Sequence, residues 1–506
     1  MSTIFIFAVI LVTTAVATAY LYMKYVFLHW KRRGVPFLEP TFPFGNFKDM
    51  ILQRLSLSDM VTTLYNKSSD ALVGVYVTVH PSLIVRDPKL LRDILIKDFQ
   101  HFTYRGANIM EDVDPMTNNL MMQNGEKWKD NRSKMTPAFS TGKLKGMIGV
   151  ILNCAQPLSK YMEQYTQTGE TIEMREVLAR FSVSVLAAVA FGININPIEN
   201  PDEEFRYFGR KFFALTPRNM LRLNLTFIYP KLVKLLRLRF ADKDVCDFIT
   251  STVKQNLDYR VKMNDLERTD FFQILMKIRN DQSGKSIMSV DEMSAHALIF
   301  FVAGFESAAA TMSYCMYEMS RKPEIQRRAQ QEIDAVLKQY DGKLTYESIA
   351  EMKYVDRCVD ETLRLHPAFG TIARECTKDY KIADTNIVIQ KGTSLIVPIA
   401  AIHRDGKYYE QPDEFIPERF DDKATANKTF LDMPYLPFGD GPRICIGLRL
   451  AKLEAKVGII CMLKDYSFEL GPQHINKELK SYPTSIAKFA VGGINLKVKS
   501  RFNNFA

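Results

Sequence analysis

The segment Pro437–Gly447 reads PFGDGPRICIG and leads into an apolar stretch with helical spacing from about residue 448 to residue 464. Cys445 lies just before the expected start of that helix. Free backbone N–H groups at a helix start stabilise an anion, so this position favours a thiolate. The plainer interpretation of a lone cysteine in a tight loop is a small buried side chain. The two interpretations stay open at this point, and only the first gives Cys445 a chemical role.

The same loop is rich in glycine and carries one cation. Glycine lets the backbone approach a flat, bulky group closely, and it stands at Gly439, Gly441 and Gly447. Arg443, two residues before the cysteine, can meet a carboxylate through charge-assisted hydrogen bonds. The loop is therefore suited to a planar ligand that carries carboxylates.

Four further segments carry residues whose spacing suggests specific contacts with other side chains. They are Trp128–Arg132, Ala303–Ser307, Glu361–Arg364 and Pro417–Phe420. Residues three or four apart share one face of a helix, so Glu361 can pair with Arg364. Taken singly, such a pair is more often a solvated surface contact, and a small-residue pair more often serves helix packing.

The cysteine loop resembles the haem-binding loop of the cytochrome P-450 family, F-x-x-G-x-R-x-C-x-G. It matches that pattern at Phe438, Gly441, Arg443, Cys445 and Gly447. The resemblance implies that the cofactor is haem b and that Cys445 is its axial thiolate and the metal ligand. The resemblance spans roughly Lys31 to Lys499, with the motifs in the family's order. The residues within the motifs are most similar to those of microsomal members and of the clan of insect xenobiotic-metabolising enzymes.

The other segments resemble further motifs of the same family. The E-x-x-R and P-E-R-F motifs imply that Glu361, Arg364 and Arg419 form a buried structural network. The A-G-x-[DE]-T motif implies that Glu306 and Ser307 are catalytic residues that deliver protons, although serine stands where threonine is usual. The W-x-x-x-R motif implies cofactor contacts. The full cofactor-binding set implied by the resemblance is Trp128, Arg132, Arg374, His403, Phe438, Arg443, Cys445 and Gly447.

Residues 1–23 contain no charged side chain and are predicted to form a transmembrane signal-anchor helix. Lys24, Lys31, Arg32 and Arg33 follow, and the positive-inside rule then places the rest of the chain in the cytoplasm. A cleaved signal peptide stays open because Ala15–Ala19 resembles a cleavage site, and a buried core helix is the other alternative. Residues 24–45 are predicted to be a basic, proline-rich connector, and residues 46–506 a single catalytic domain.

The remaining chain predicts a mainly α fold with a minor β-sheet region, an α+β class. Strands are expected in residues 73–86, with a turn at His80-Pro81-Ser82, and near 486–499. Helices are expected from Pro88 to about Phe99, over 289–321 with a Ser289–Glu292 capping box, from Pro323 to about Asp341, and over 348–365. Residues 212–240 suit either a surface-lying membrane contact or a helix packed on the core.

The composition narrows the partners. The formal net charge is +10, but no zinc-finger or RNA-recognition signature accompanies it, so no nucleic acid is expected. Seven cysteines without a C-x-x-C pair indicate reduced thiols facing the cytosol. The sequence contains no G-x-G-x-x-G fingerprint for binding a nucleotide of its own. Electrons from NADPH therefore have to reach it through a separate partner protein.

The resemblance then implies an NADPH- and O2-dependent monooxygenase of the endoplasmic reticulum membrane that acts on a lipophilic small molecule. Its implied partners are NADPH-cytochrome P-450 reductase, which holds the flavins, cytochrome b5 as an optional further electron donor, and membrane lipid. A basic face at Lys127, Lys129, Arg132 and Arg443 is expected to dock the reductase. A pocket is expected from 100–125, 205–225, Phe301, Ala303, Phe369–Ile372 and Thr484–Ile486. The alternatives are a haem-thiolate isomerase or dehydratase, and a non-catalytic haem carrier.

Overall fold

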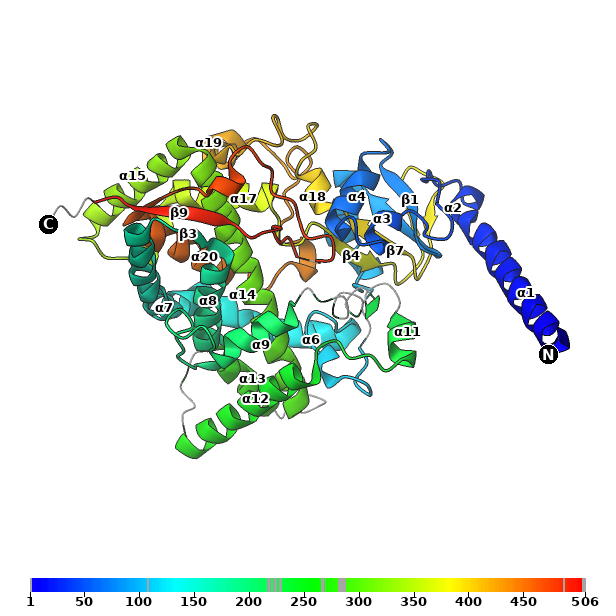
Figure 1. The fold of residues 1–506 in the computed structure, drawn as a ribbon, viewed down its shortest axis with the longest axis horizontal. Helices are drawn as coiled ribbons and strands as arrows, with labels where there is room; N and C mark the ends of the chain where they lie inside the picture. Colours follow the sequence, from blue (N-terminus) through cyan, green and yellow to red (C-terminus); the bar gives the residue numbers. More distant parts are fainter. Residues whose placement is uncertain are drawn as a thin grey trace.

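The computed structural model describes residues 2–106, 109–214, 216, 219, 222, 225–226, 230–264, 268, 270–280, 288–485 and 487–502. Figure 1 shows a large helical part, a smaller sheet-containing part beside it, and one helix that projects away at the N-terminal end. The predicted class, mainly helical with small sheets, is confirmed.

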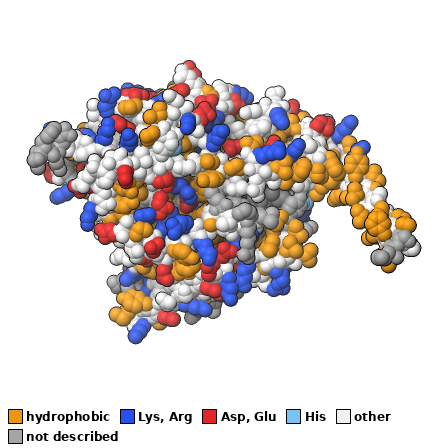
Figure 2. Space-filling model, viewed as in Figure 1, with side chains coloured by type: hydrophobic (Ala, Val, Ile, Leu, Met, Phe, Trp, Pro, Cys, Tyr) orange, Lys and Arg blue, Asp and Glu red, His pale blue; other side chains and the backbone are white. Residues whose placement is uncertain are grey.

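The projecting helix is α1 (Ser2–Phe27), which extends the predicted anchor by one turn. None of the side chains of its apolar span Thr3–Phe27 is buried in the protein. Hydrophobic side chains cover this helix along its visible length in Figure 2, whereas the body of the protein shows mixed charges. A second long helix, α14 (Val290–Arg321), is less apolar, with a mean hydropathy of 1.4 against 2.4 for α1, and it is mostly buried, which marks it as a core helix.

The end of α1 is fastened to the first sheet. Trp30, in the short helix α2 (His29–Arg32), donates from Nε1 to the carbonyl of Val75 at 3.1 Å, and its ring packs on Gly74. The Tyr76 hydroxyl donates to the carbonyl of Phe27 at 2.8 Å. The first residues of the predicted connector therefore pack on the sheet.

The four-stranded sheet has the order β1-β2-β7-β4. Strands β1 (Leu72–Val77) and β2 (His80–Val85) are antiparallel, β2 pairs in parallel with β7 (Ser394–Val397), and β7 is antiparallel to β4 (Ile372–Glu375). The predicted turn at His80–Ser82 is wrong, because Val77 pairs with His80 and the turn is Thr78–Val79. Thr78 supplies the positive φ of 53° that a two-residue hairpin turn requires.

Two smaller sheets complete the β structure. One contains β3 (Thr171–Glu173), β9 (Asn495–Ser500) and β8 (Tyr466–Leu470) in the order β3-β9-β8. The other pairs β5 (Tyr380–Lys381) with β6 (Val388–Ile389). The closing strand predicted near 486–499 is thus β9, displaced toward the C-terminus.

The helical part is built around α14, whose 32 residues span about 48 Å at a rise of about 1.5 Å per residue. It packs on α8 (Met174–Leu186), α12 (Lys243–Met263), α17 (Lys353–Leu365) and α20 (Leu448–Leu463). The other helices are α3 (Lys48–Ile51), α4 (Leu57–Tyr65), α5 (Pro88–Arg92), α6 (Gly125–Met135), α7 (Thr141–Thr168), α9 (Glu204–Phe212), α11 (Pro230–Leu235), α13 (Phe271–Asn280), α15 (Pro323–Gln339), α16 (Tyr346–Glu351), α18 (Ile399–Ile402) and α19 (Asp422–Thr425).

Several predicted boundaries are confirmed by their caps. The Asp87 carboxylate accepts from the N–H of Leu90 at 2.8 Å and begins α5. Ser289 accepts from the N–H of Glu292 at 3.0 Å and begins α14. The reciprocal half of the predicted capping box is not formed, because the Glu292 carboxylate instead accepts from Gln123 and Asn131.

Two predicted helices are divided in the structure. The helix expected over 348–365 is interrupted at Met352, whose ψ of 75° separates α16 from α17. The helix expected from Pro88 to Phe99 changes winding into a π-helical turn η1 (Asp93–Lys97) and a 3-10 turn η2 (Phe99–His101). Both interruptions occur where buried side chains pack against other elements, a constraint that local spacing does not report.

Candidate active site

The cysteine loop is a tight turn that delivers Cys445 to the start of α20. The Cys445 N–H donates to the Phe438 carbonyl at 3.0 Å, and a short 3-10 turn η7 (Gly441–Arg443) lies between them. The backbone N–H groups of Gly447 and Leu448, at the start of α20, act to lower the pKa of the Cys445 thiol. The predicted geometry, a sulfur facing the open end of a helix, is therefore present. Phe438 is half-buried and packs its ring on the core.

The three glycines of this loop have different surroundings. Gly441 has a φ of +70°, and a Cβ added there would lie 1.9 Å from the carbonyl oxygen of Leu95 in η1. Gly439 also has a positive φ, whereas a Cβ on Gly447 would meet no protein atom within 4 Å. The expectation that all three admit a planar group is thus wrong for Gly441, which is required by the close packing of its loop on η1.

Opposing influences act on the Cys445 thiol. The Cys445 side chain is accessible, although protein surrounds it on most sides. Burial raises the pKa of this thiol, while the Gly447 N–H, Arg105 and Arg132 act in the opposite direction. A cation bound at the sulfur supplies the additional positive charge that favours the thiolate.

Four arginines gather around the cysteine: Arg105, Arg132, Arg374 and Arg443. Burial, together with the charges of the three other guanidinium groups, lowers the pKa of Arg443 to about 8. Burial likewise lowers the pKa of Arg374 to about 9 and that of Arg105 to about 10. Such mutual repulsion is costly unless an anion is held among the four groups.

The hydrogen bonds of the four arginines go to neutral acceptors. Arg132 donates to the Ile444 carbonyl at 2.8 Å, Arg105 to the Arg443 carbonyl at 3.0 Å, and Arg374 to the Ala373 carbonyl at 2.9 Å. Within the described part of the chain, no carboxylate lies at ion-pair distance from any of them.

Three buried donors in this cluster have no partner among the described residues. They are Nε and Nη1 of Arg443 and Nε of Arg374. Arg443 also stacks on the Trp128 ring with a centroid distance of 4.0 Å and donates to the Gln123 carbonyl at 2.7 Å. Buried, correctly held and unsatisfied guanidinium donors next to a cysteine sulfur match the two carboxylates and the metal of haem b.

His403 has a different position from the one expected. Its Nε2 accepts from the N–H of Leu436 at 2.8 Å, and its Nδ1 lies 3.2 Å from the Arg364 carbonyl. Both ring nitrogens are therefore engaged by the protein, and neither is left for a propionate. Burial and the charge of Arg364 lower the pKa of His403 to about 3, so the ring is neutral and ties the cysteine loop to α17.

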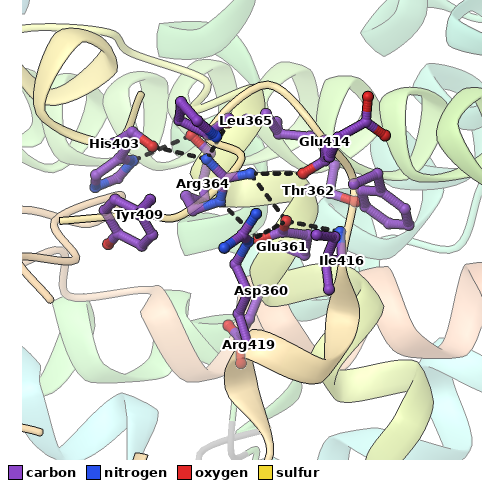
Figure 3. Close-up of polar contacts among 12 residues, drawn as sticks. Asp360, Glu361, Thr362, Arg364, Leu365, His403, Tyr409, Glu414, Ile416 and Arg419 are labelled. Atoms are coloured by element: carbon purple, nitrogen blue, oxygen red, sulfur yellow. Dashed lines mark hydrogen bonds and ion pairs between the residues drawn. The ribbon is translucent and has the colours of Figure 1, made fainter. Parts of the chain in front are cut away.

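The Glu361–Arg364–Arg419 network is present as expected from the motifs. Arg364 donates from Nε and Nη2 to the two Glu361 oxygens at 2.7 and 2.9 Å, and Arg419 Nε lies 3.2 Å from Glu361. Figure 3 shows that Arg364 points at Glu361 and, on its other side, at the carbonyls of His403 and Glu414. Glu361 and Arg364 are fully buried, so their charges depend on this pairing.

On α14, the residues of the predicted oxygen-handling motif face different partners. Ala303 is exposed, and Gly304 and Ser307 are half-exposed, in the middle of an otherwise buried helix. The Ser307 hydroxyl donates to the Ala303 carbonyl at 2.7 Å. Glu306 is buried and turns toward α8, where it pairs with Arg175.

Three residues of this site belong to none of the motifs. Arg105 lies outside every motif, and only its position beside Cys445 reveals it. Gln123 and Asn124 orient Arg443 from the segment before α6, and the polar run before Trp128 was the one local signal available.

The fold and this site define a class, a helical haem-thiolate protein whose cysteine ligand precedes α20. Comparison with known proteins places the chain within that class. The family model described as Cytochrome P450 matches residues 36–492. The chain is 35% identical over 482 residues to the probable cytochrome P450 6a14 of Drosophila melanogaster, which covers 92% of this chain and 94% of that protein. It is 35% identical to cytochrome P450 6a2 of the same fly over 98% of this chain and 99% of that protein. It is 33% identical to cytochrome P450 6k1 of Blattella germanica over 92% and 91%.

The chain belongs to the cytochrome P450 family. It is an oxidoreductase of the haem-thiolate monooxygenase type, with haem b as cofactor and NADPH electrons supplied through a reductase, as is standard for the family. The resemblance to insect members is confirmed. The N-terminal apolar helix is consistent with a membrane anchor.

Proposed function

We propose that this monooxygenase inserts one oxygen atom into a lipophilic small molecule, a xenobiotic or an endogenous lipid or hormone, using residues 46–506 as one catalytic domain. The observation that carries the proposal is the Cys445 sulfur at the start of α20, beside buried guanidinium donors that have no carboxylate. Cys445 would bind the iron, and Trp128, Arg105, Arg132, Arg374 and Arg443 would hold the propionates. When bound, the haem supplies oxygen activation.

The apolar side chains of the expected pocket support an apolar substrate. Phe369 is 38% exposed although it lies between α17 and β4, and Ala303 is exposed on α14. Phe301, expected to line the pocket, is instead 1% exposed and packs on Phe205 with ring centroids 5.5 Å apart. Thr484 is half-buried, whereas Ile486 and much of 205–225 lie outside the described residues. An apolar wall with few polar groups selects ligands by shape and lipophilicity.

The experiment that tests the proposal is product formation from a lipophilic probe, 7-ethoxycoumarin. Deethylation that requires NADPH, oxygen and added reductase supports a monooxygenase. Spectroscopically intact protein that needs no reductase and rearranges a hydroperoxide instead would support the isomerase or dehydratase alternative. Haem binding without turnover of this probe or of a wider lipophilic set would support a haem carrier.

The partner is proposed to be NADPH-cytochrome P-450 reductase, with cytochrome b5 as a possible second donor. The expected docking face changes in the structure, because Arg443 is buried and Lys127 is paired with Glu292 at 3.4 Å and Glu111 at 3.5 Å. Lys129 lies on the same turn of α6 and is exposed. No carboxylate among the described residues forms an ion pair with it. Lys129 is therefore the residue of this face best placed to meet an acidic protein.

Reversing the charge of Lys129 should slow electron delivery. We expect Lys129→Glu to lower the rate of reduction by the reductase several-fold at low ionic strength, with the difference fading as salt screens the contact. Stopped-flow reduction over a salt series measures this. Lys338→Glu, on the exposed face of α15, is the matched control and should leave the rate unchanged. Equal rates for both variants would remove Lys129 from the docking face.

The location is proposed to be the endoplasmic reticulum membrane, with α1 as a single-pass anchor and the rest facing the cytoplasm. Support comes from the unburied apolar span of α1 and from the basic residues that follow it. Leu232, Leu235 and Leu236 at α11 are also exposed, at 38%, 78% and 54%, which favours the membrane-contact interpretation of that region over a helix packed on the core.

Deleting residues 2–27 should convert most of the protein from a carbonate-resistant membrane fraction to a fraction that salt or carbonate releases. A smaller share is expected to stay bound through α11. Fractionation of cells that express the full and shortened chains measures this. An unchanged membrane share after deletion would contradict the role of α1.

A further inference from the structure

The first turn of α14 carries a buried carboxylate that collects donors from a distant part of the chain. One oxygen of Glu292 accepts from the side-chain amides of Gln123 and Asn131, each at 3.1 Å. Its other oxygen lies 3.4 Å from Nζ of Lys127. The Glu292 side chain is 9% exposed. It therefore fastens α6, and the segment before α6, to the start of α14.

A neighbouring histidine fastens the same segment to α14 one turn further on. Nδ1 of His296 accepts from the N–H of Leu120 at 3.2 Å, and Nε2 lies 3.8 Å from the first Glu292 oxygen. Burial acts to raise the pKa of Glu292, but the contacts with His296 and Lys127 outweigh it and hold that pKa below its usual value. Glu292 is therefore ionised, and an ionised acceptor forms stronger hydrogen bonds than a neutral one.

Gln123 connects this carboxylate to the arginine cluster. Its amide nitrogen donates to Glu292 and, at 2.9 Å, to Oδ1 of Asn118. Its amide oxygen accepts from Asn131 at 3.0 Å. The backbone carbonyl of the same residue accepts from Nη2 of Arg443 at 2.7 Å. Because Gln123 is fully buried and both polar atoms of its side chain are bonded, the direction of this carbonyl is fixed.

The second side of Arg443 rests on α6. Its guanidinium carbon lies 4.0 Å from the centroid of Trp128, which is one turn before Asn131 on that helix. Asn131 in turn bonds α6 to Glu292. Among the described residues, Nε and Nη1 of Arg443 have no partner. The carbonyl and the ring that hold this guanidinium group thus both belong to segments that Glu292 fastens.

We propose that Glu292 is the positioning residue that keeps Arg443 directed at a haem propionate, through the Gln123 carbonyl on one side and Trp128 of α6 on the other. The inference rests on the proposed function, in which Arg443 holds a propionate. Glu292 acts through these residues and not on the haem itself. Its replacement should therefore weaken the propionate contact while ligation by Cys445 remains.

The primary test is the propionate bending band in the resonance Raman spectrum of the haem-loaded ferric protein, which falls in frequency when hydrogen bonds to the propionates weaken. Glu292→Met removes both acceptor oxygens at nearly constant volume and should lower this frequency. Arg443→Met removes the donor itself and sets the full size of the shift. Glu292→Gln keeps one oxygen for Gln123 and Asn131 and should restore most of the wild-type frequency.

The matched control replaces a second buried acid of the same helix. Glu318 is 2% exposed and pairs with His366 at 2.7 Å and with Arg321 at 3.0 Å, neither of which belongs to the segments that hold Arg443. Glu318→Met therefore removes a comparable buried charge and should leave the propionate band at the wild-type frequency. A shift of equal size in both variants would mean that the band reports a general loosening of the fold, and would overturn the proposal.

Gln123→Leu keeps the inference testable if Glu292→Met does not bind haem. Leucine leaves the backbone carbonyl that Arg443 uses and removes only the side chain that tethers it, so the band should move in the same direction. The second readout is the rate of haem transfer to apomyoglobin. We expect Glu292→Met to raise this rate roughly 5-fold, the factor that corresponds to about one net hydrogen bond.

Two further results would overturn the proposal, and they differ in what else they affect. A band that moves in Arg443→Met, but in neither Glu292→Met nor Gln123→Leu, would leave the propionate assignment intact and remove Glu292 from it. A band that stays in place in Arg443→Met would show that Arg443 holds no propionate, and that part of the proposed function would fail as well. The ligand role of Cys445 is judged separately, by the carbon monoxide spectrum of the wild type.

Discussion

Replacing Cys445 by alanine should abolish the carbon monoxide difference spectrum of a thiolate-ligated haem and reduce product formation to background. The sulfur is the one side chain that the cysteine loop presents at the start of α20, where the N–H groups of Gly447 and Leu448 point at it. Neither alanine nor a water molecule in its place donates the electron density with which a thiolate favours O–O cleavage. The measurement is the spectrum of the dithionite-reduced protein with carbon monoxide, beside NADPH-dependent turnover.

Cys461→Ala is the matched control for that experiment. Cys461 lies within α20, is 7% exposed and has no role in the site. Its replacement should therefore cost about 1 kcal/mol of packing and leave the spectrum intact. A red-shifted thiolate band that persists in Cys445→Ala would contradict the assignment of the ligand. A band typical of histidine-ligated haem in the wild type would contradict it equally.

Replacing Glu361 by glutamine should destabilise the protein by about 3–5 kcal/mol, because Arg364 would be left fully buried without its counter-charge. Glutamine would leave a single neutral amide oxygen for Arg364, Arg419 and the N–H of Ile416, of which the last two now lie 3.2 and 2.8 Å from one carboxylate oxygen. Since Arg364 also fixes the carbonyl of His403, and His403 holds the N–H of Leu436 at the head of the cysteine loop, we expect haem retention to fall with stability.

Haem content after purification and the urea midpoint of unfolding measure this effect. Glu418→Gln, in the neighbouring P-E-R-F segment, is the matched control because Glu418 forms an exposed pair with Arg328. Exposed pairs contribute roughly 0–1 kcal/mol, so Glu418→Gln should behave like the wild type. Equal stability of the Glu361 and Glu418 variants would mean that the buried network does not support the haem side of the fold.

The sequence alone determined the features that depend on local chemistry. Helix starts at Pro88 and Val290 follow from capping residues within three positions, and the structure contains both caps. Cys445 and the Glu361–Arg364 pair could be identified because their spacing along one turn or one loop is itself the signal. The apolar anchor is equally local, since its length and lack of charge suffice.

Tertiary structure decided the features that join distant segments. Arg105 reaches Cys445 across more than 300 residues of sequence, and Arg175 reaches Glu306 across 131. The sequence around His403 does not indicate that the N–H of Leu436 and the carbonyl of Arg364 engage both of its ring nitrogens. The sequence around Phe301 likewise does not indicate that Phe205 of α9 packs on it. The physical reason is that burial and partner choice depend on which elements pack together, whereas a motif reports only the neighbours that the chain itself supplies.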